Sequence, residues 1–220
     1  MPLISRGSSK PARASTGKAT ASSASPSHSS EKLASRHRRL PLSGISALLR
    51  SRFHEHRFVA LAILSIQFKH ATPAERESIV SFYLNHTKWI NNWDLVDASA
   101  PYILGEYLKT QSCELLGQLA RSADLWERRI AIVSTLALIK GGEIEDAFRI
   151  AELLLPDKHD LIHKAIGWAL RETGKISRPA SLQFLQKHYN RMPRTALRYA
   201  IEHLPPQARK QALSGIFTAD

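Results

Sequence analysis

The sequence holds little that could cross-link a fold, bind a metal through sulfur or cross a membrane. Cys113 is the single cysteine among 220 residues, which excludes an internal disulfide and a cysteine-ligated zinc site and is typical of a reducing compartment. The longest apolar runs, such as 58–68 and 130–139, are interrupted by polar residues well short of the roughly 20 that cross a bilayer. We therefore expect no membrane-spanning helix.

Motifs for several enzyme classes are also missing. The sequence has no glycine-rich phosphate loop, no nucleophile elbow and no Ser-His-Asp arrangement. Of its ten histidines, His54 and His56 lie two residues apart and would point in different directions on a helix. His159 and His163 share a helix face but lack the glutamate and third ligand of a zinc protease. We expect no metal site.

Positive charge is what the chain has in excess, and it is unevenly placed. The net charge is +12, and residues 1–40 hold eight Lys or Arg and one Glu, which supplies more than half of it. This segment has eleven serines and no aromatic residue, so it cannot bury enough apolar surface to offset the entropy of ordering it. It predicts a disordered basic tail, with a cleaved organellar targeting segment as the less favoured alternative. The charge favours a polyanionic partner.

From residue 41 onward the sequence is typical of helices, which defines a second region, 41–220. Thr72-Pro73-Ala74-Glu75 combines an N-cap, a proline at the first helical position and a capping-box acid. Alternating strand patterns bounded by hairpin turns are absent from the sequence. The predicted fold is all-α, with helices expected over 57–68, 73–84, 128–139, 144–155, 160–172, 180–189, 193–204 and 206–213.

A faint repeat indicates how these helices are arranged. Ala-Ile pairs begin at Ala131, Ala165 and Ala200, at intervals of 34 and 35 residues, each in the second helix of a predicted pair. A small residue at a fixed position lets neighbouring helices approach closely, and a recurring helix pair of this length is typical of an α-solenoid. We expect a curved stack of antiparallel helix pairs whose concave face carries the function.

Two tryptophan-bearing segments are candidates for a site. Trp93 and Asp97 would share a helix face, although on the residues alone packing by Trp93 and capping by Asp97 is the favoured interpretation. Lys164, Trp168 and Arg171 form a stripe that suits either a phosphate-and-base surface or a half-buried boundary helix. If the second helices of the pairs line one surface, they predict a basic groove for phosphates, to which Arg128, Arg129, Arg194 and Arg198 would also contribute.

Taken together, these segments resemble the bacterial DNA alkylation repair enzymes of the AlkD type, which are HEAT-like α-solenoid DNA glycosylases. The segments that carry the resemblance follow one another in family order over roughly residues 45–205. They are HEHR at 54–57, NWDLVD at 92–97, WERRIAI at 126–132, KAIGWALRE at 164–172 and MPRTALRYA at 192–200.

The resemblance implies a site and a reaction. Asp97 would be the catalytic carboxylate, Trp93 and Trp168 the indoles that flank the lesion, and Arg129 the arginine of the cleft. The implied reaction is the release of N3- or N7-alkylated purines from double-stranded DNA, as in base excision repair, with the lesion still stacked and with no metal or organic cofactor. The backbone of the duplex would be held by Arg128, Lys164, Arg171, Arg194 and Arg198.

The resemblance also implies a monomeric bacterial enzyme in the cytoplasm, associated with the nucleoid through its DNA. Family members have more helical sequence ahead of the Trp-Asp motif, so the segment 41–92 implies that the first helix pair is missing or replaced. The alternative function is a HEAT-like scaffold that binds DNA or protein and has weak or no catalytic activity.

Overall fold

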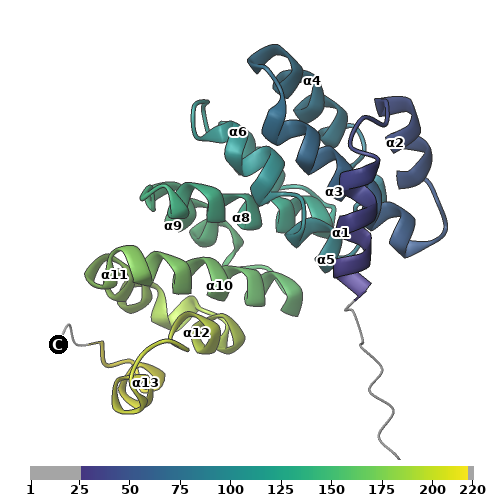
Figure 1. The fold of residues 1–220 in the computed structure, drawn as a ribbon. Helices are drawn as coiled ribbons and strands as arrows, with labels where there is room; N and C mark the ends of the chain where they lie inside the picture. The colour runs from purple at the N-terminus through teal and green to yellow at the C-terminus, as the bar shows by residue number, and fades with distance from the viewer. Residues whose placement is uncertain (1–25, 218–220) are drawn as a thin grey trace, which may run out of the picture.

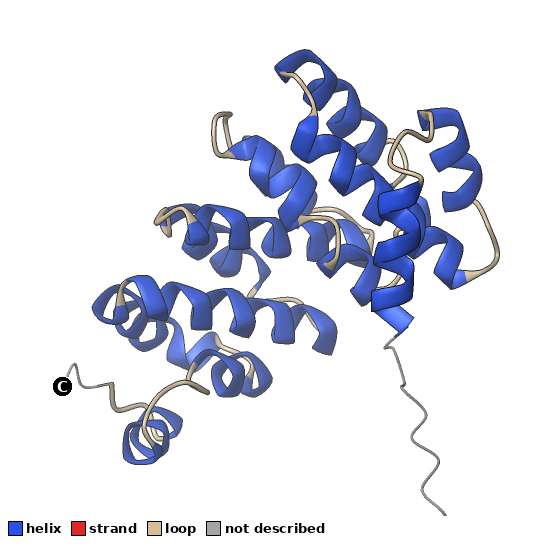
Figure 2. Ribbon diagram, in the orientation of Figure 1, coloured by secondary structure: helices blue, strands red, loops and turns tan. Residues whose placement is uncertain are grey.

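Helices make up all the regular structure of residues 26–217, which are the residues that this computed structural model describes (Figure 2). The predicted all-α fold is confirmed. The α-helices are α1 (Pro26–Arg36), α2 (Leu42–Leu49), α3 (His54–His70), α4 (Pro73–Leu84), α5 (Trp93–Asp97), α6 (Glu106–Leu108), α7 (Glu114–Ala120), α8 (Leu125–Lys140), α9 (Glu145–Leu154), α10 (Asp160–Ile176), α11 (Arg178–His188), α12 (Arg194–Ala200) and α13 (Pro206–Leu213). Two short 3-10 helices are η1 (Thr87–Trp89) and η3 (Tyr189–Arg191), and η2 (Pro101–Gly105) is a π-helix that leads directly into α6.

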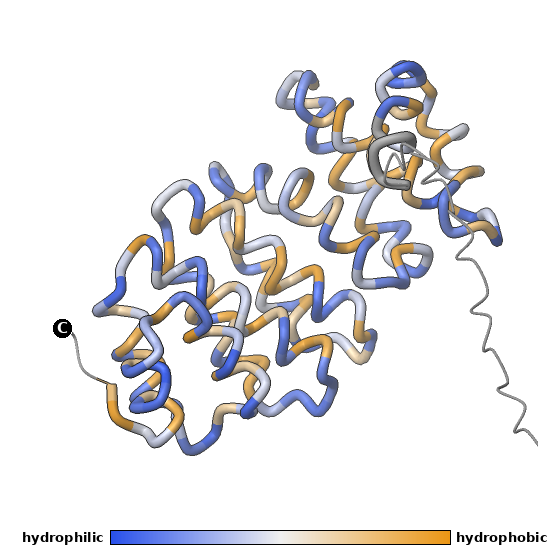
Figure 3. The backbone as a smooth tube through the Cα atoms, turned by 60° about the horizontal axis from the view of Figure 1, so that its bottom comes forward, coloured by the Kyte–Doolittle hydropathy of each residue, from blue (hydrophilic) through white to orange (hydrophobic). Residues whose placement is uncertain are grey.

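The helices stack one after another into a curved α-solenoid (Figure 1). An inner layer consists of α3, η2 with α6, α8, α10 and α12, and each of these packs on the next. Helices α7, α9 and α11 cover one side of this layer. We call its other side the open face. In Figure 3 apolar positions alternate with hydrophilic ones along the helices, as expected for helices that bury one side.

Small residues set the spacing of the inner layer. A Cβ atom at Gly167 in α10 would come within 2.5 Å of the carbonyl oxygen of Ala196 in α12. A Cβ atom at Gly105 in η2 would come within 2.8 Å of the Cβ of Ala137 in α8. Only glycine permits these approaches. The alanines of the predicted repeat are likewise buried between helices, at Ala131, Ala165 and Ala200.

Local sequence signals explain where several helices begin. The predicted capping box is present, because Thr72 accepts a hydrogen bond from the Glu75 backbone while Glu75 Oε2 accepts one from the Thr72 backbone at 2.7 Å. Helix α10 runs past the predicted end at residue 172 and continues through Gly174 to Ile176. A Cβ at Gly174 would lie 2.9 Å from the ring of His203, so this glycine allows close packing instead.

The N-terminal region differs from the prediction, because part of the predicted tail is folded. Helix α1 packs against α3 and buries Ala34 completely. The polar composition of α1 concealed this helix, since the buried Ala34 is a small side chain in a largely polar segment. Residues 1–25 of the predicted tail lie outside the described residues. Helices α1 to α4 all precede Trp93. The absence or replacement of the family's first helix pair stays a prediction.

The described helices do not include one that combines the length and apolar character of a bilayer span. Their buried apolar residues form a hydrophobic core that extends from Ala34 to Ala212. This core fixes the inner layer and thereby the open face that carries the predicted site residues.

Candidate functional site

The short helix α5 places Trp93 and Asp97 one turn apart on the same side, as predicted. Asn92 caps its start, where the Asn92 Oδ1 accepts a hydrogen bond from the Trp93 backbone at 2.8 Å. A helix of five residues is not stable alone, so side-chain contacts must hold it. One of these joins Asp94 Oδ2 to His54 Nε2 of α3 at 2.6 Å.

A buried hydrogen-bond chain fixes the other end of α5. The hydroxyl groups of Tyr83 and Ser99 lie 3.0 Å apart, and Ser99 Oγ also donates to the carbonyl oxygen of Leu95 at 2.6 Å. Burial raises the pKa of the Tyr83 phenol, so this group stays neutral and keeps its hydrogen bond at physiological pH. Helices α3 and α4 therefore set the position of the Trp93–Asp97 turn.

The side chain of Asp97 forms a bidentate ion pair with Arg129 of α8. Arg129 Nε donates to Asp97 Oδ1 at 3.0 Å, and Arg129 Nη2 donates to Asp97 Oδ2 at 2.8 Å. Arg129 Nη1 donates to the carbonyl oxygen of Leu161 at 2.5 Å, which links α10 to the pair. Arg129 is only 5% exposed. The arginine therefore orients the carboxylate and joins three helices.

Opposing effects act on the charge of Asp97. Burial raises the pKa of its carboxyl group, and the hydrogen bonds and charge of Arg129 oppose that rise. Protonation of Asp97 would leave the buried Arg129 without its counter-charge, and an arginine does not lose its own proton in proteins. We therefore expect Asp97 to be ionised at neutral pH.

Asp97 lines a cavity of about 510 Å³ on the open face, and Trp168 of α10 lines the same cavity. The walls of the cavity are formed by the η2–α6 segment, by helix α8 and by helix α10. Asp97 retains 19% exposure of its side chain, so the paired carboxylate remains accessible. The structure thus brings Asp97 into direct contact with Arg129 and places Trp168 in the wall of the same cavity as Asp97.

Trp93 is not part of this cavity. It lies on α5 with 52% of its surface exposed, one turn from Asp97. The packing interpretation of Trp93, which the residues alone favoured, does not fit an indole that is half exposed. Asp97 likewise does not cap a helix, because Arg129 binds both of its oxygens.

Several cations of the predicted basic groove are paired within the protein. Arg128 Nε lies 2.6 Å from Asp157 Oδ2, and both side chains are largely buried. Lys164 Nζ lies 2.7 Å from Asp160 Oδ2 on the surface, one helical turn away. Surface pairs of this kind are weak, so Lys164 can exchange its partner for a phosphate, whereas Arg128 is less free to do so.

The remaining cations of the predicted groove differ in their freedom. Arg171 is paired with Glu202, whereas the guanidinium of Arg194 donates to the carbonyl oxygen of Leu213 at 3.1 Å. Arg198 is exposed and forms no ion pair within residues 26–217. Arg129 is buried with each nitrogen hydrogen-bonded. The open face is therefore less basic than the sequence suggested.

The histidines that could suggest a metal have other partners. His54 pairs with Asp94, and His163 Nε2 lies 2.6 Å from the carbonyl oxygen of Asp157. His159 caps α10 through a hydrogen bond from the Leu161 backbone. Within the described part of the chain, no group of three or more His, Cys, Asp or Glu side chains is arranged to hold a metal.

Sequence reasoning missed part of the cavity wall. Tyr102, which is 58% exposed, and Glu106 line the cavity from η2 and α6. On α10 the wall continues from Trp168 through Glu172 to Lys175, at helical spacings of four and three. Extending the predicted stripe toward the end of its helix would have found these last two residues.

The fold and the site define the class: an all-helical solenoid with an acid–arginine pair and an indole on its open face. Residues 28–204 match the family described as DNA alkylation repair enzyme, which includes most of α1. The chain therefore belongs to the DNA alkylation repair enzyme family. No curated protein matches the chain.

Two solved structures share the fold. One is described as a predicted DNA alkylation repair enzyme from Enterococcus faecalis, with a TM-score of 0.64 and 18% identity over 82% of this chain and 85% of that one. The other is AlkD2 from Streptococcus mutans, with a TM-score of 0.58 and 16% identity over 80% of this chain and 88% of that one. At these identities the similarity establishes the fold alone.

Proposed function

We propose that this protein is a DNA glycosylase that hydrolyses the N-glycosidic bond of cationic N3- or N7-alkylated purines in double-stranded DNA. Membership of the family supports a role in DNA alkylation repair. The observation that carries the specific reaction is the placement of Asp97, held by Arg129, in the wall of a cavity shared with Trp168.

The chemistry requires stabilisation of charge on the sugar. Alkylation at N3 or N7 makes the purine positively charged, so it leaves with the electron pair of the N-glycosidic bond as a neutral base. The deoxyribose then develops positive charge at C1′, as in other glycoside cleavages. A carboxylate fixed beside C1′ stabilises this charge and orients the water that attacks it. Asp97 is the proposed source of both effects.

Arg129 is proposed as a positioning residue and not as a phosphate contact. Its bidentate hydrogen bonds fix both oxygens of Asp97, and they favour the ionised carboxylate. Preorganisation matters because a carboxylate that must reorient during the reaction stabilises the transition state less. The positive charge of Arg129 also weakens the negative field of Asp97. The reaction therefore depends on an alkylated base that is already a good leaving group.

The two indoles would add to the stabilisation. Trp168 lies in the cavity with Asp97, and Trp93 lies one turn away with a largely open ring. An indole face attracts a nearby positive charge by about 0.5–2 kcal/mol. These contacts do not help an undamaged nucleotide, whose leaving group is poor. Selectivity would come largely from the lesion, which we propose stays in the base stack.

The test is a base-release assay on methylated duplex DNA. We expect the purified protein to release 7-methylguanine or 3-methyladenine and to leave an equal amount of abasic sites, with and without EDTA. The alternative is a solenoid scaffold that binds DNA or protein with little or no catalysis. Duplex binding without release of either base would establish that alternative and contradict the glycosylase proposal.

A further inference from the structure

The longest run of basic residues in the chain lies outside the candidate site. It is Arg36-His37-Arg38-Arg39, at the end of α1, and all four residues are exposed. We call it the basic turn. The sequence placed it in a disordered tail, where ordering it on a ligand would oppose binding. The structure instead shows it folded against α3.

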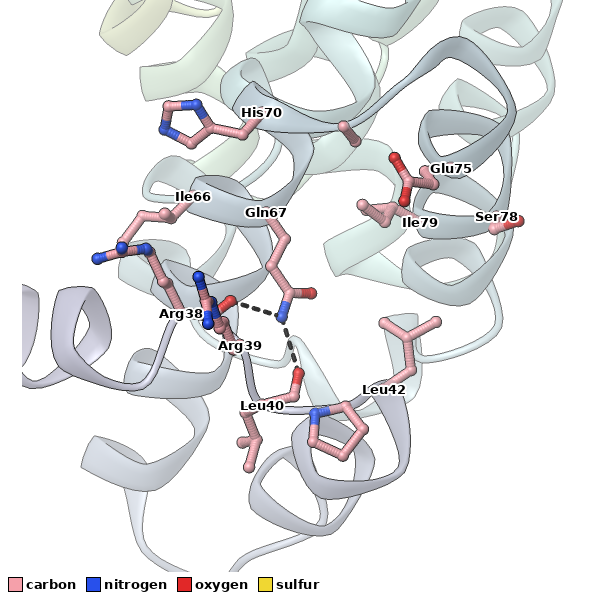
Figure 4. A pocket seen from close by; sticks show the side chains of 12 residues that line it. Arg38, Arg39, Leu40, Leu42, Ile66, Gln67, His70, Glu75, Ser78 and Ile79 are labelled. Carbon is pink, nitrogen blue, oxygen red and sulfur yellow. Dashed lines mark hydrogen bonds between the residues drawn. The ribbon is translucent and has the colours of Figure 1, made fainter.

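Gln67 of α3 holds the basic turn in place. Its side-chain amide donates to the carbonyl oxygen of Arg38 at 2.9 Å and to that of Leu40 at 2.7 Å (Figure 4). Within the turn, the Leu40 backbone donates to the carbonyl oxygen of His37 at 2.9 Å. On the side of the turn, these bonds involve only backbone atoms. The cationic side chains are therefore positioned but remain available to a ligand.

Acidic side chains do not neutralise the basic turn within the described residues. Arg36, Arg38 and Arg39 form no ion pair there, in contrast to the paired cations near Asp97. One acidic side chain, Glu75, lines the cavity beside the turn, but it accepts hydrogen bonds from Thr72. In Figure 4, Arg38 and His70 lie on one side of Gln67, and Glu75 lies on the other.

Three cavities, each of which shares lining residues with the next, lie between the basic turn and the candidate site. The cavity beside the turn measures about 650 Å³ and is lined by Arg38, Arg39 and Ile66. Ile66 also lines a second cavity of about 460 Å³, which contains Lys69 and Arg76. That cavity shares Tyr102 and Glu106 with the one that holds Asp97 and Trp168. These cavities follow the inner layer from α3 to α10.

We propose that the basic turn is a phosphate-binding site for the backbone of the duplex whose lesion lies at Asp97. Exposed, unpaired arginines suit phosphodiesters, because their planar guanidinium groups can bind two phosphate oxygens at once. A preformed turn also binds with a smaller loss of conformational entropy than a tail does. The proposal rests on DNA as the substrate of the proposed function but not on the glycosylase chemistry.

The experiment measures the salt dependence of binding to undamaged duplex DNA. Each phosphate contact contributes a slope of about −0.9 to the plot of log K against log salt concentration. We expect the double variant Arg38→Gln with Arg39→Gln, made in the full chain, to bind DNA more weakly and to have a slope that is less negative by about 2. The matched control is Arg209→Gln with Lys210→Gln on α13, which removes the same charge from two exposed residues.

The outcomes separate this proposal from the proposed function. A slope that falls for the variant in the turn and not for the control supports the site, even if the protein releases no alkylated base. Equal slopes for the wild type and the variant in the turn would overturn it, even if base release is active. An equal fall for both double variants would show a general charge effect and would also overturn the proposal.

Discussion

Asp97 and Arg129, 32 residues apart in the sequence, face each other through two hydrogen bonds of 3.0 and 2.8 Å. Asp97 and the Leu161 carbonyl oxygen occupy all three guanidinium nitrogens of Arg129, which does not favour the phosphate contact that the sequence suggested. The arginine is buried and forms hydrogen bonds to both α5 and α10, so it fixes the position of the Asp97 carboxylate from the buried side of the site. The carboxylate is the member of the pair that the cavity exposes.

Removing the arginine should destabilise the fold. Arg129→Met leaves Asp97 as a partly buried charge without a partner, and breaking a buried pair in this way costs about 3–5 kcal/mol. Urea unfolding followed by circular dichroism measures the loss. As a control, Lys164→Met breaks an exposed pair and should leave the midpoint nearly unchanged. Equal effects of the two substitutions would show that the buried pair has no special importance.

The pH dependence of stability tests the charge state of Asp97. Burial raises its pKa in the folded protein above the ordinary value of 3.8, so the folded state binds the proton more tightly than the unfolded state. The contribution of Asp97 is therefore greatest below pH 3.8 and is lost as the pH rises through the folded pKa. The free energy of unfolding of Asp97→Asn, measured relative to that of the wild type, should therefore rise as the pH increases across that window.

The measurement is a set of urea unfolding curves for the wild type and Asp97→Asn, recorded from about pH 3.5 to neutrality because the ordinary pKa of an aspartate is about 3.8. The difference between the two proteins isolates the effect of Asp97 from that of the other carboxylates. If the relative stability of Asp97→Asn instead falls as the pH rises, Arg129 dominates over burial and the pKa of Asp97 is lowered.

Trp93 should matter for activity more than for stability. Its indole is 52% exposed, so Trp93→Ala removes little packing. Loss of a cation–π contact of about 0.5–2 kcal/mol corresponds to a roughly 2- to 30-fold slower base release. Single-turnover base release, with the unfolding midpoint as the control, measures this. An unchanged rate would remove Trp93 from the site, and a large fall in the midpoint would show a structural role.

Gly167 should be required for the packing of α10 on α12. A Cβ atom there would come within 2.5 Å of the Ala196 carbonyl oxygen, which is backbone and cannot move independently. We expect Gly167→Ala to cost about 1–3 kcal/mol in thermal or urea unfolding. Gly117→Ala on α7 is the control, because its Cβ would meet only the flexible guanidinium ends of Arg149 and Arg121, at 3.1 and 3.3 Å. A neutral Gly167→Ala would indicate that the helices are spaced more loosely.

The sequence predicted what depends on local signals. The capping box at Thr72, the all-helical pattern and the small residues of the repeat are local features, and the structure contains each of them. The partner of Lys164 was also readable, because Asp160 lies four residues earlier on the same helix. Attention to acidic residues at this spacing would have shown that the predicted groove is partly neutralised.

Other features could not be read from the sequence because they join distant segments. The contact between Arg128 and Asp157 connects α8 with the loop before α10, and the Asp97–Arg129 pair connects α5 with α8. Helix α1 was missed because its composition is that of a solvated segment, although it packs against α3 and buries Ala34. Tertiary packing overrode composition there.

The most direct test compares two neighbouring carboxylates on α5. Asp97→Asn and Asp94→Asn make the same change in charge and size, but Asp94 is bound to His54 and is absent from the wall of the cavity. In single-turnover release of 7-methylguanine from duplex DNA, Asp97→Asn should lose about 100-fold or more and still bind DNA. Asp94→Asn keeps an oxygen that can accept a hydrogen bond from His54, so it should retain most of the rate. Equal rates for the wild type and Asp97→Asn would contradict the assignment of Asp97 as the catalytic group.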